Sequence, residues 1–295
     1  TDGPVRGRRV GGLRAWRGIP YAAPTAGPRR FRAPAPIEPW SEVRECTEFG
    51  DAPPQAKSYT ALRPGKYQPT SEDCLTVNVL APAHDDGTKR PVMVYIYGGA
   101  YIMGMSATGV YNGSALVRRG DVAYVSFNYR VGTLGYLDFS RYSTPERPFD
   151  SNLGLRDQVA ALEWVQRNIA AFGGDPDNVT LFGESAGGNA VTTLMTTPAA
   201  RGLFARAIAQ SSAPGLVTTA DRAADWAEQF VDLLPLDDVS DPVAALERAT
   251  PGELGRAGNR LTAKVISETP GLIPFGPVVD GDFLPRPPLD AYTDG

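Results

Sequence analysis

A short turn of small residues, Gly183-Glu184-Ser185-Ala186-Gly187, constrains the fold more than any other stretch of this chain. The apolar run at 179–182 before it indicates a strand, and the small-residue segment 186–197 after it indicates a helix. Glycines two before and two after the serine let a strand turn abruptly into a helix without Cβ clashes. The chain is therefore predicted to contain the strand–turn–helix unit of an α/β fold.

Strand-like and helix-like segments alternate along the rest of the chain. Strands are predicted at residues 75–80, 92–97, 122–128, 179–182 and 205–210, and helices at 155–172, 186–197, 220–234 and 241–250. Before residue 75, repeated prolines favour edge strands and irregular loops. No internal repeat or linker-like change of composition interrupts this order, so a single α/β domain is predicted over residues 1–295.

Composition excludes several classes of function. The formal net charge of -4 gives a mildly negative surface, which disfavours nucleic acid as a partner. The sequence contains no run of about 18 apolar residues, so a membrane span is not predicted. Two cysteines and a single histidine cannot make a four-ligand zinc site, so metal catalysis is disfavoured and no cofactor is predicted.

The serine turn points to nucleophilic catalysis by Ser185. A serine hydroxyl is a weak nucleophile, so the fold must expose its oxygen, bring a base to it and place donors where charge develops on a substrate carbonyl. The bare five-residue pattern also occurs by chance as a serine in a glycine turn. The flanking strand and helix favour the catalytic interpretation.

A second strip of small residues, Tyr97-Gly98-Gly99-Ala100, follows the predicted strand at 92–97. Small residues let the backbone approach a ligand and present consecutive N–H groups. With the N–H of Ala186, they would form a three-donor oxyanion hole, in which each donor is worth about 10² to 10³ in rate. The alternative is a simple glycine turn that closes the strand.

Cys46 and Cys74 are separated by 27 residues, a loop-like segment with several prolines. A disulfide between them would close a long excursion and stabilise the fold by about 3 to 4 kcal/mol. Two unrelated buried thiols fit the spacing equally well.

Long motifs across the chain make it resemble the type-B carboxylesterase family, which includes bacterial para-nitrobenzyl esterases, cholinesterases and the non-catalytic neuroligins. These motifs are Arg17-Gly18-Ile19-Pro20-Tyr21-Ala22, Ser71-Glu72-Asp73-Cys74-Leu75-Thr76-Val77-Asn78-Val79, Asn128-Tyr129-Arg130-Val131-Gly132, Asn152-Leu153-Gly154-Leu155-Arg156-Asp157-Gln158, Phe172-Gly173-Gly174-Asp175-Pro176, Phe182-Gly183-Glu184-Ser185-Ala186-Gly187-Gly188 and Pro277-Val278-Val279-Asp280-Gly281. The resemblance implies an α/β-hydrolase fold, with a predominantly parallel central sheet and helices on both faces, and serine carboxylesterase activity.

The resemblance also implies roles for individual residues. Ser185 would be the nucleophile, and the backbone N–H groups of Gly99, Ala100 and Ala186 would form the oxyanion hole. Glu184 would support the hydrogen-bond network of the active site. Two further pairs would be structural: Arg30 with Glu72 as a buried ion pair, and Cys46 with Cys74 as a disulfide, which suggests export from the cell.

The chain departs from this family in its catalytic triad. In α/β-hydrolases the acid and then the histidine follow the serine along the chain, yet the sole histidine, His84, precedes Ser185 and lies in a polar loop. The family's triad glutamate and histidine would both fall beyond Gly295. We therefore expect the chain to be the N-terminal part of a longer enzyme, in which a further segment supplies both residues.

The resemblance partly defines the substrate. The tryptophan with which cholinesterases bind a quaternary ammonium is replaced here by a residue near Pro64, so choline esters are not favoured. Acyl-pocket aromatics of that group fall near Gly271 and Ile273, which implies a roomier pocket. The predicted substrates are neutral aryl or alkyl esters of short to medium acyl chains. A neuroligin-like binding module, or hydrolysis of amides, carbamates or lactones by the same nucleophile, are the alternatives.

Overall fold

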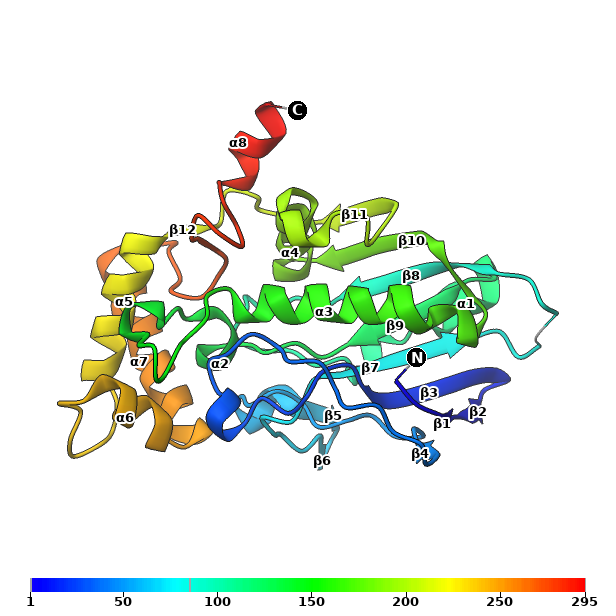
Figure 1. Ribbon diagram of the computed structural model, residues 1–295, viewed down its shortest axis with the longest axis horizontal. Helices are drawn as coiled ribbons and strands as arrows, with labels where there is room; N and C mark the ends of the chain where they lie inside the picture. The colour runs from blue at the N-terminus through cyan, green and yellow to red at the C-terminus, as the bar shows by residue number, and fades with distance from the viewer. Residues whose placement is uncertain (1, 85, 295) are drawn as a thin grey trace.

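A mixed seven-stranded sheet forms the centre of the molecule (Figure 1). The computed structural model describes residues 2–84 and 86–294. In spatial order the strands are β11 (Arg206–Gln210), β10 (Gly174–Glu184), β8 (Arg90–Ile96), β9 (Ala123–Phe127), β7 (Thr76–Ala81), β3 (Leu13–Pro20) and β2 (Arg8–Val10). The four strands from β11 to β9 run parallel, whereas β7 is antiparallel to both of its neighbours and β2 is antiparallel to β3.

Apolar strands at the centre of this sheet form the core. In β8, Val92, Val94 and Ile96 are fully buried, and every residue of β9 is buried. The three β8 residues share one face, and Tyr95 on the other face is also buried, while the continuous burial of β9 requires cover on both faces, because successive side chains of a strand point to opposite sides. The sequence prediction of buried central strands is therefore confirmed.

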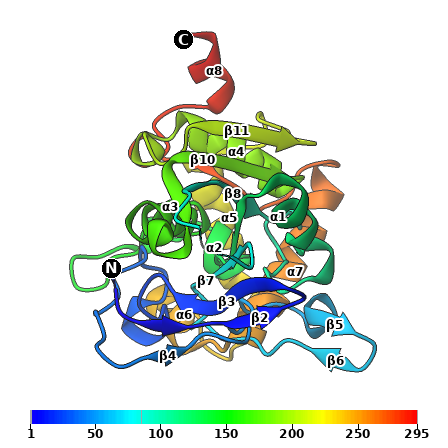
Figure 2. The ribbon, with the colours of Figure 1, turned by 90° about the vertical axis from the view of Figure 1, so that its right-hand side faces the viewer.

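Helices cover both faces of the sheet, with α3 on one side and α1 on the other (Figure 2). The helices that pack on the sheet are α1 (Ser114–Gly120), α3 (Leu153–Asn168) and α4 (Ala186–Thr196), whereas the short α2 (Thr133–Tyr136) packs against α3. The predicted apolar stripe of α3, which includes Leu155, Leu162 and Val165, is fully buried. Among the described residues, no helix has both the length and the apolar character needed to cross a membrane.

A group of helices, α5 (Ala220–Asp232), α6 (Pro242–Arg248) and α7 (Pro251–Glu268), lies at the carboxyl end of the parallel strands (Figure 1). The sequence predicted α5 and α6 but not α7, whose apolar stripe is diluted by three glycines. A capping box marks its start: the Thr250 side chain accepts from the N–H of Glu253, and the Glu253 carboxylate accepts from the N–H of Thr250. The last helix, α8 (Pro288–Thr293), projects from the body of the fold.

The segment before β7 is mostly loop, as its prolines predicted. Its short strands form minor pairs, β1 (Val5–Arg6) with β4 (Arg44–Glu45) and β5 (Ala61–Arg63) with β6 (Lys66–Tyr67), while β12 (Thr218–Thr219) pairs with β13 (Val278–Val279) later in the chain. The Arg30–Glu72 ion pair forms as predicted, with Arg30 Nε 2.9 Å from Glu72 Oε2 and both side chains largely buried. Arg30 also donates to the carbonyls of Leu246 and Ala249, so it joins the loop to the end of α6.

The predicted disulfide between Cys46 and Cys74 is absent, because both residues are free, buried thiols. Backbone hydrogen bonds hold Cys46 beside Arg17 of β3, whereas Cys74 lies next to Leu75, which accepts from the N–H of Tyr21. Cys46 thus lies beside β3 itself, whereas Cys74 is next to a residue that bonds to the chain just beyond the end of β3. The expectation of export rested on that bridge and loses its support.

Candidate active site

Ser185 lies where β10 ends and α4 begins, with φ 57° and ψ −124°. Few residues other than glycine adopt this conformation, and it costs of order 1 to 3 kcal/mol. The surrounding backbone holds it: the Ser185 N–H donates to Gln210 O of β11 (3.0 Å), and Ser185 O accepts from the N–H of Asn189 (2.8 Å). The predicted strand–turn–helix unit is thus present, and its serine side chain is exposed.

The glycine-rich strip after β8 lies directly against this turn. A Cβ on Gly98 would be 2.6 Å from Glu184 O and 3.0 Å from Ser185 Cβ. A Cβ on Gly187 would be 2.1 Å from Ile96 O, at the end of β8. Only glycine fits at either position, so the sequence brings the two predicted elements within contact distance of each other.

The backbone of the strip is turned into the left-handed region at three consecutive residues, Gly99 (φ 123°), Ala100 (φ 52°) and Tyr101 (φ 62°). Within the described part of the chain, the N–H groups of Gly99 and Ala100 donate to no protein acceptor. Ala186 is the first residue of α4, where N–H groups have no acceptor within the helix. All three predicted oxyanion donors are thereby left available to a ligand beside Ser185.

Two polar contacts that the sequence did not predict support this strip. Gln55 donates from Nε2 to Gly104 O and accepts at Oε1 from Gly104 N–H, both at 2.9 Å. The buried Tyr101 hydroxyl donates to Asn189 Oδ1 of α4 (2.8 Å). Neither contact has a local sequence signal, since each joins segments at least 49 residues apart.

Glu184 is exposed beside the nucleophile, and its Oε2 would be 3.3 Å from a Cβ on Gly98. Its carboxylate makes no hydrogen bond to the other described residues. Burial, and then the nearby Glu184 charge, raise the pKa of Tyr111. Glu184 is thus close enough to this tyrosine to act on it electrostatically, and its supporting role in the active site stays a prediction.

His84 lies away from Ser185. Its Nε2 is 3.3 Å from Arg90 Nη2 at the amino end of β8, whereas Ser185 lies near the carboxyl end of the paired strand β10. The length of β8 separates the two positions by about 20 Å. His84 therefore cannot act as the base, as the sequence predicted.

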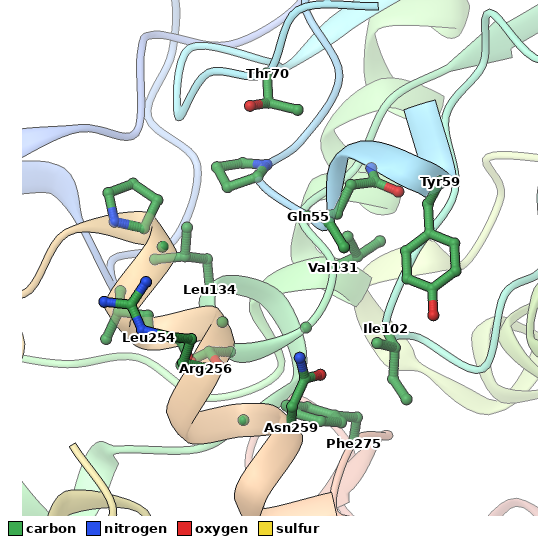
Figure 3. Close-up of a pocket in the computed structure, with 18 residues that line it drawn as sticks. Gln55, Tyr59, Thr70, Ile102, Val131, Leu134, Leu254, Arg256, Asn259 and Phe275 are labelled. Carbon is green, nitrogen blue, oxygen red and sulfur yellow. Dashed lines mark hydrogen bonds between the residues drawn. The ribbon is translucent and has the colours of Figure 1, made fainter. Parts of the chain in front are cut away.

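A large cavity, of about 340 Å³, lies beyond the strip and against α7 (Figure 3). Ile102 belongs to its wall, and the Ile102 N–H donates to Gly99 O (3.0 Å). Figure 3 shows Gln55 and Val131 on one side and Leu254 and Asn259 of α7 on another. Its described lining includes Arg256 but no carboxylate, and is otherwise mainly apolar.

The predicted acyl-pocket residues lie in the loop between α7 and β13. Gly271 is exposed with open space around its Cβ position, and Ile273 is half-buried. Neither belongs to the wall of the large cavity, although Phe275 of the same loop does. Their role stays a prediction.

Comparison with known proteins agrees with this geometry. A model of the carboxylesterase family matches residues 1–295. Para-nitrobenzyl esterase of Bacillus subtilis (strain 168) is 40% identical over 99% of this chain and 58% of its own length. Fumonisin B1 esterase of Sphingopyxis macrogoltabida is 39% identical over 97% of this chain and 51% of its own length. Among solved structures, a thermophilic PNB esterase has a TM-score of 0.90 at 40% identity, covering 100% of this chain and 59% of that one. The chain thus spans a little more than half the length of these relatives.

Proposed function

Because the chain belongs to the carboxylesterase family, we propose that it carries the nucleophile and the oxyanion hole of a carboxylic ester hydrolase. The observation that carries this proposal is the contact between Gly98 and Ser185, which sets two unpaired backbone donors beside an exposed serine. The relatives named above are esterases, whereas a non-catalytic binding module would have no use for the strained Ser185 backbone. Ester hydrolysis is therefore the function that the site supports best.

The reaction follows from this arrangement. Ser185 Oγ attacks the ester carbonyl carbon while its proton passes to a base, and the N–H groups of Gly99, Ala100 and Ala186 stabilise the oxyanion. The C–O bond then breaks, the alcohol leaves with the proton, and an acyl-Ser185 remains. Water attacks this acyl group, which releases the carboxylic acid and restores the hydroxyl.

The base and its acid partner come, in this proposal, from outside residues 1–295, because no histidine follows Ser185. Strand β11 supports such a partner segment: it pairs with β10 alone among the described strands, and its Ile208 side chain is exposed. A free edge of this kind pairs readily with a further strand. A purified, fully active species of 31.5 kDa with no companion segment would contradict this part of the proposal.

The substrates we propose are neutral aryl or alkyl esters with short to medium acyl chains. The mainly apolar cavity suits an uncharged group of modest size, because its one charged lining residue, Arg256, is exposed and lies 4.0 Å from the Glu253 carboxylate. The test is a series of para-nitrophenyl esters from acetate to palmitate, with para-nitroacetanilide as the amide counterpart. We expect kcat/KM to be highest for short to medium esters. A maximum at palmitate would contradict the substrate class, and faster cleavage of the anilide would contradict the reaction class.

Gln55 gives a prediction about the oxyanion strip. In Gln55→Ala, both hydrogen bonds to Gly104 are lost and the strip is held less firmly. We therefore expect kcat to fall about tenfold, which is less than the loss of about 10² to 10³ expected when one oxyanion donor is removed altogether. KM should change much less. Gln68→Ala is the matched control, because Gln68 makes similar bonds to the carbonyls of Phe49 and Gly50 away from the strip. A raised KM with unchanged kcat would instead assign Gln55 to substrate binding.

A further inference from the structure

A second cavity, of about 130 Å³, opens beside strands β3, β7 and β9, separate from the large cavity against α7. Its wall combines the aromatic rings of Phe49, Tyr111 and Tyr124 with the polar side chains of Arg17, Asn78 and Ser106. No aspartate or glutamate of the described chain lines it. The cavity therefore has an apolar body and a single charged group, which is positive.

Arg17 supplies that charge, and no described carboxylate forms an ion pair with it. One face of its guanidinium stacks on the Phe49 ring, with Cζ 4.4 Å from the ring centroid. The neighbouring Glu48 is paired with Arg8 (2.8 Å). Burial, and then the charge of Arg8, lower the pKa of Arg17, and the Glu48 carboxylate offsets them only in part. Stacking fixes the guanidinium plane and leaves its N–H edge free for a planar acceptor.

The same cavity is also lined by two buried polar side chains. Asn78 Nδ2 donates to Ser106 Oγ (3.0 Å), and both side chains are buried. Ser106 accepts this bond, so its own hydroxyl hydrogen can turn toward a ligand. A buried group with an unused donor favours an occupant that brings an acceptor.

We infer that this cavity is a binding site for a small organic monocarboxylate, with its carboxylate on Arg17 and its apolar part among the three rings. A cavity of about 150 Å³ lined by apolar residues holds benzene, so one aromatic ring or a short acyl chain matches the available space. Bidentate pairing with guanidinium is the characteristic recognition of carboxylates.

The site is distinct from the candidate active site. Tyr111 lies between them: it lines the small cavity, and its ring stacks on Tyr97, the first residue of the oxyanion strip, at 6.3 Å between centroids. Ser185 and its oxyanion donors do not line the small cavity. The inference therefore does not depend on the proposed esterase function.

Isothermal titration calorimetry with benzoate, and with neutral benzamide of the same shape, tests the inference on the purified protein. Benzoate should bind at least about tenfold more tightly than benzamide, and Arg17→Gln should weaken benzoate binding about tenfold or more. Arg17→Lys keeps the charge but loses the planar fork, so an intermediate loss is expected. Arg9→Gln, an exposed neighbour outside the cavity, is the matched control and should bind as the parent does.

Each outcome of these titrations either supports the site or overturns it. Selective benzoate binding that weakens in Arg17→Gln and persists in Arg9→Gln supports the site. Equal affinity for benzoate and benzamide would show an apolar cavity without carboxylate recognition and overturn it. Binding that is indifferent to both Arg17 variants would place the ligand elsewhere, including at Ser185, and would also overturn it. So would the absence of benzoate binding. If Arg17→Gln does not fold, the affinity of Arg17→Lys for benzoate decides: weaker binding supports the site, and unchanged binding overturns it.

Discussion

Replacement of Ser185 by alanine is expected to lower kcat about 10⁶-fold in the ester-hydrolysing protein, the loss seen when a triad hydrolase loses its nucleophile. The alanine leaves no oxygen to form the acyl-enzyme, although the oxyanion donors of Gly99 and Ala100 remain. Residual hydrolysis should then come from carbonyl polarisation alone. Steady-state kinetics with a para-nitrophenyl ester measure the effect.

Ser212→Ala is the matched control for this variant. Ser212 lies near the same helix, with its Oγ 2.9 Å from Thr192 Oγ1, but belongs to no part of the proposed machinery. Its kcat should stay within about threefold of the parent, because a single exposed or half-buried hydroxyl contributes little. A loss of less than about tenfold in Ser185→Ala would remove this serine from the mechanism.

Replacement of Asp157 by asparagine is expected to destabilise the fold by about 3 to 5 kcal/mol, the usual result of breaking a buried ion pair from one side. Asp157 and Arg130 are almost completely buried and pair through two bonds, Nη2–Oδ1 at 2.7 Å and Nε–Oδ2 at 2.8 Å. Arg130 also donates to Arg32 O, so the pair joins α3, the end of β9 and the N-terminal loop. Urea unfolding measures the change.

The control for Asp157 lies on the same helix. Glu163 of α3 approaches Arg167 at 3.8 Å, and both side chains are about half exposed. Exposed pairs contribute between zero and about 1 kcal/mol, so Glu163→Gln should leave the urea midpoint nearly unchanged. Equal effects of the two variants would contradict the assignment of Asp157 and Arg130 as a buried structural pair.

The sequence predicted the elements whose patterns are local. The apolar runs of β8 and β9 and the helical stripe of α3 are confirmed. Burial of a strand on both faces leaves a continuous apolar run in the sequence, and burial of one helix face leaves apolar residues three and four apart. The turn at Ser185 was also predictable, since its glycines permit a backbone that few other residues allow. These elements define the α/β-hydrolase fold and the position of its serine.

Features that depend on distant segments were not predictable. The support of Gly104 by Gln55 and the bond between Tyr101 and Asn189 exist only because the fold brings separate segments together. The disulfide prediction was wrong for a similar reason, because the fold decides whether two buried thiols meet and their spacing along the chain does not. Helix α7 was missed because glycines interrupt its stripe, although Thr250, Pro251 and Glu253 do mark its start.

The identity of the nucleophile is tested most directly by covalent labelling with a fluorophosphonate. Trypsin releases residues 168–201 as one peptide, in which Ser185 is the single serine. We predict that ester hydrolysis is lost as the label is incorporated, and that mass spectrometry finds one adduct, on Ser185 of this peptide. Complete loss of activity with the peptide unmodified, or with the label on another residue, would contradict the account.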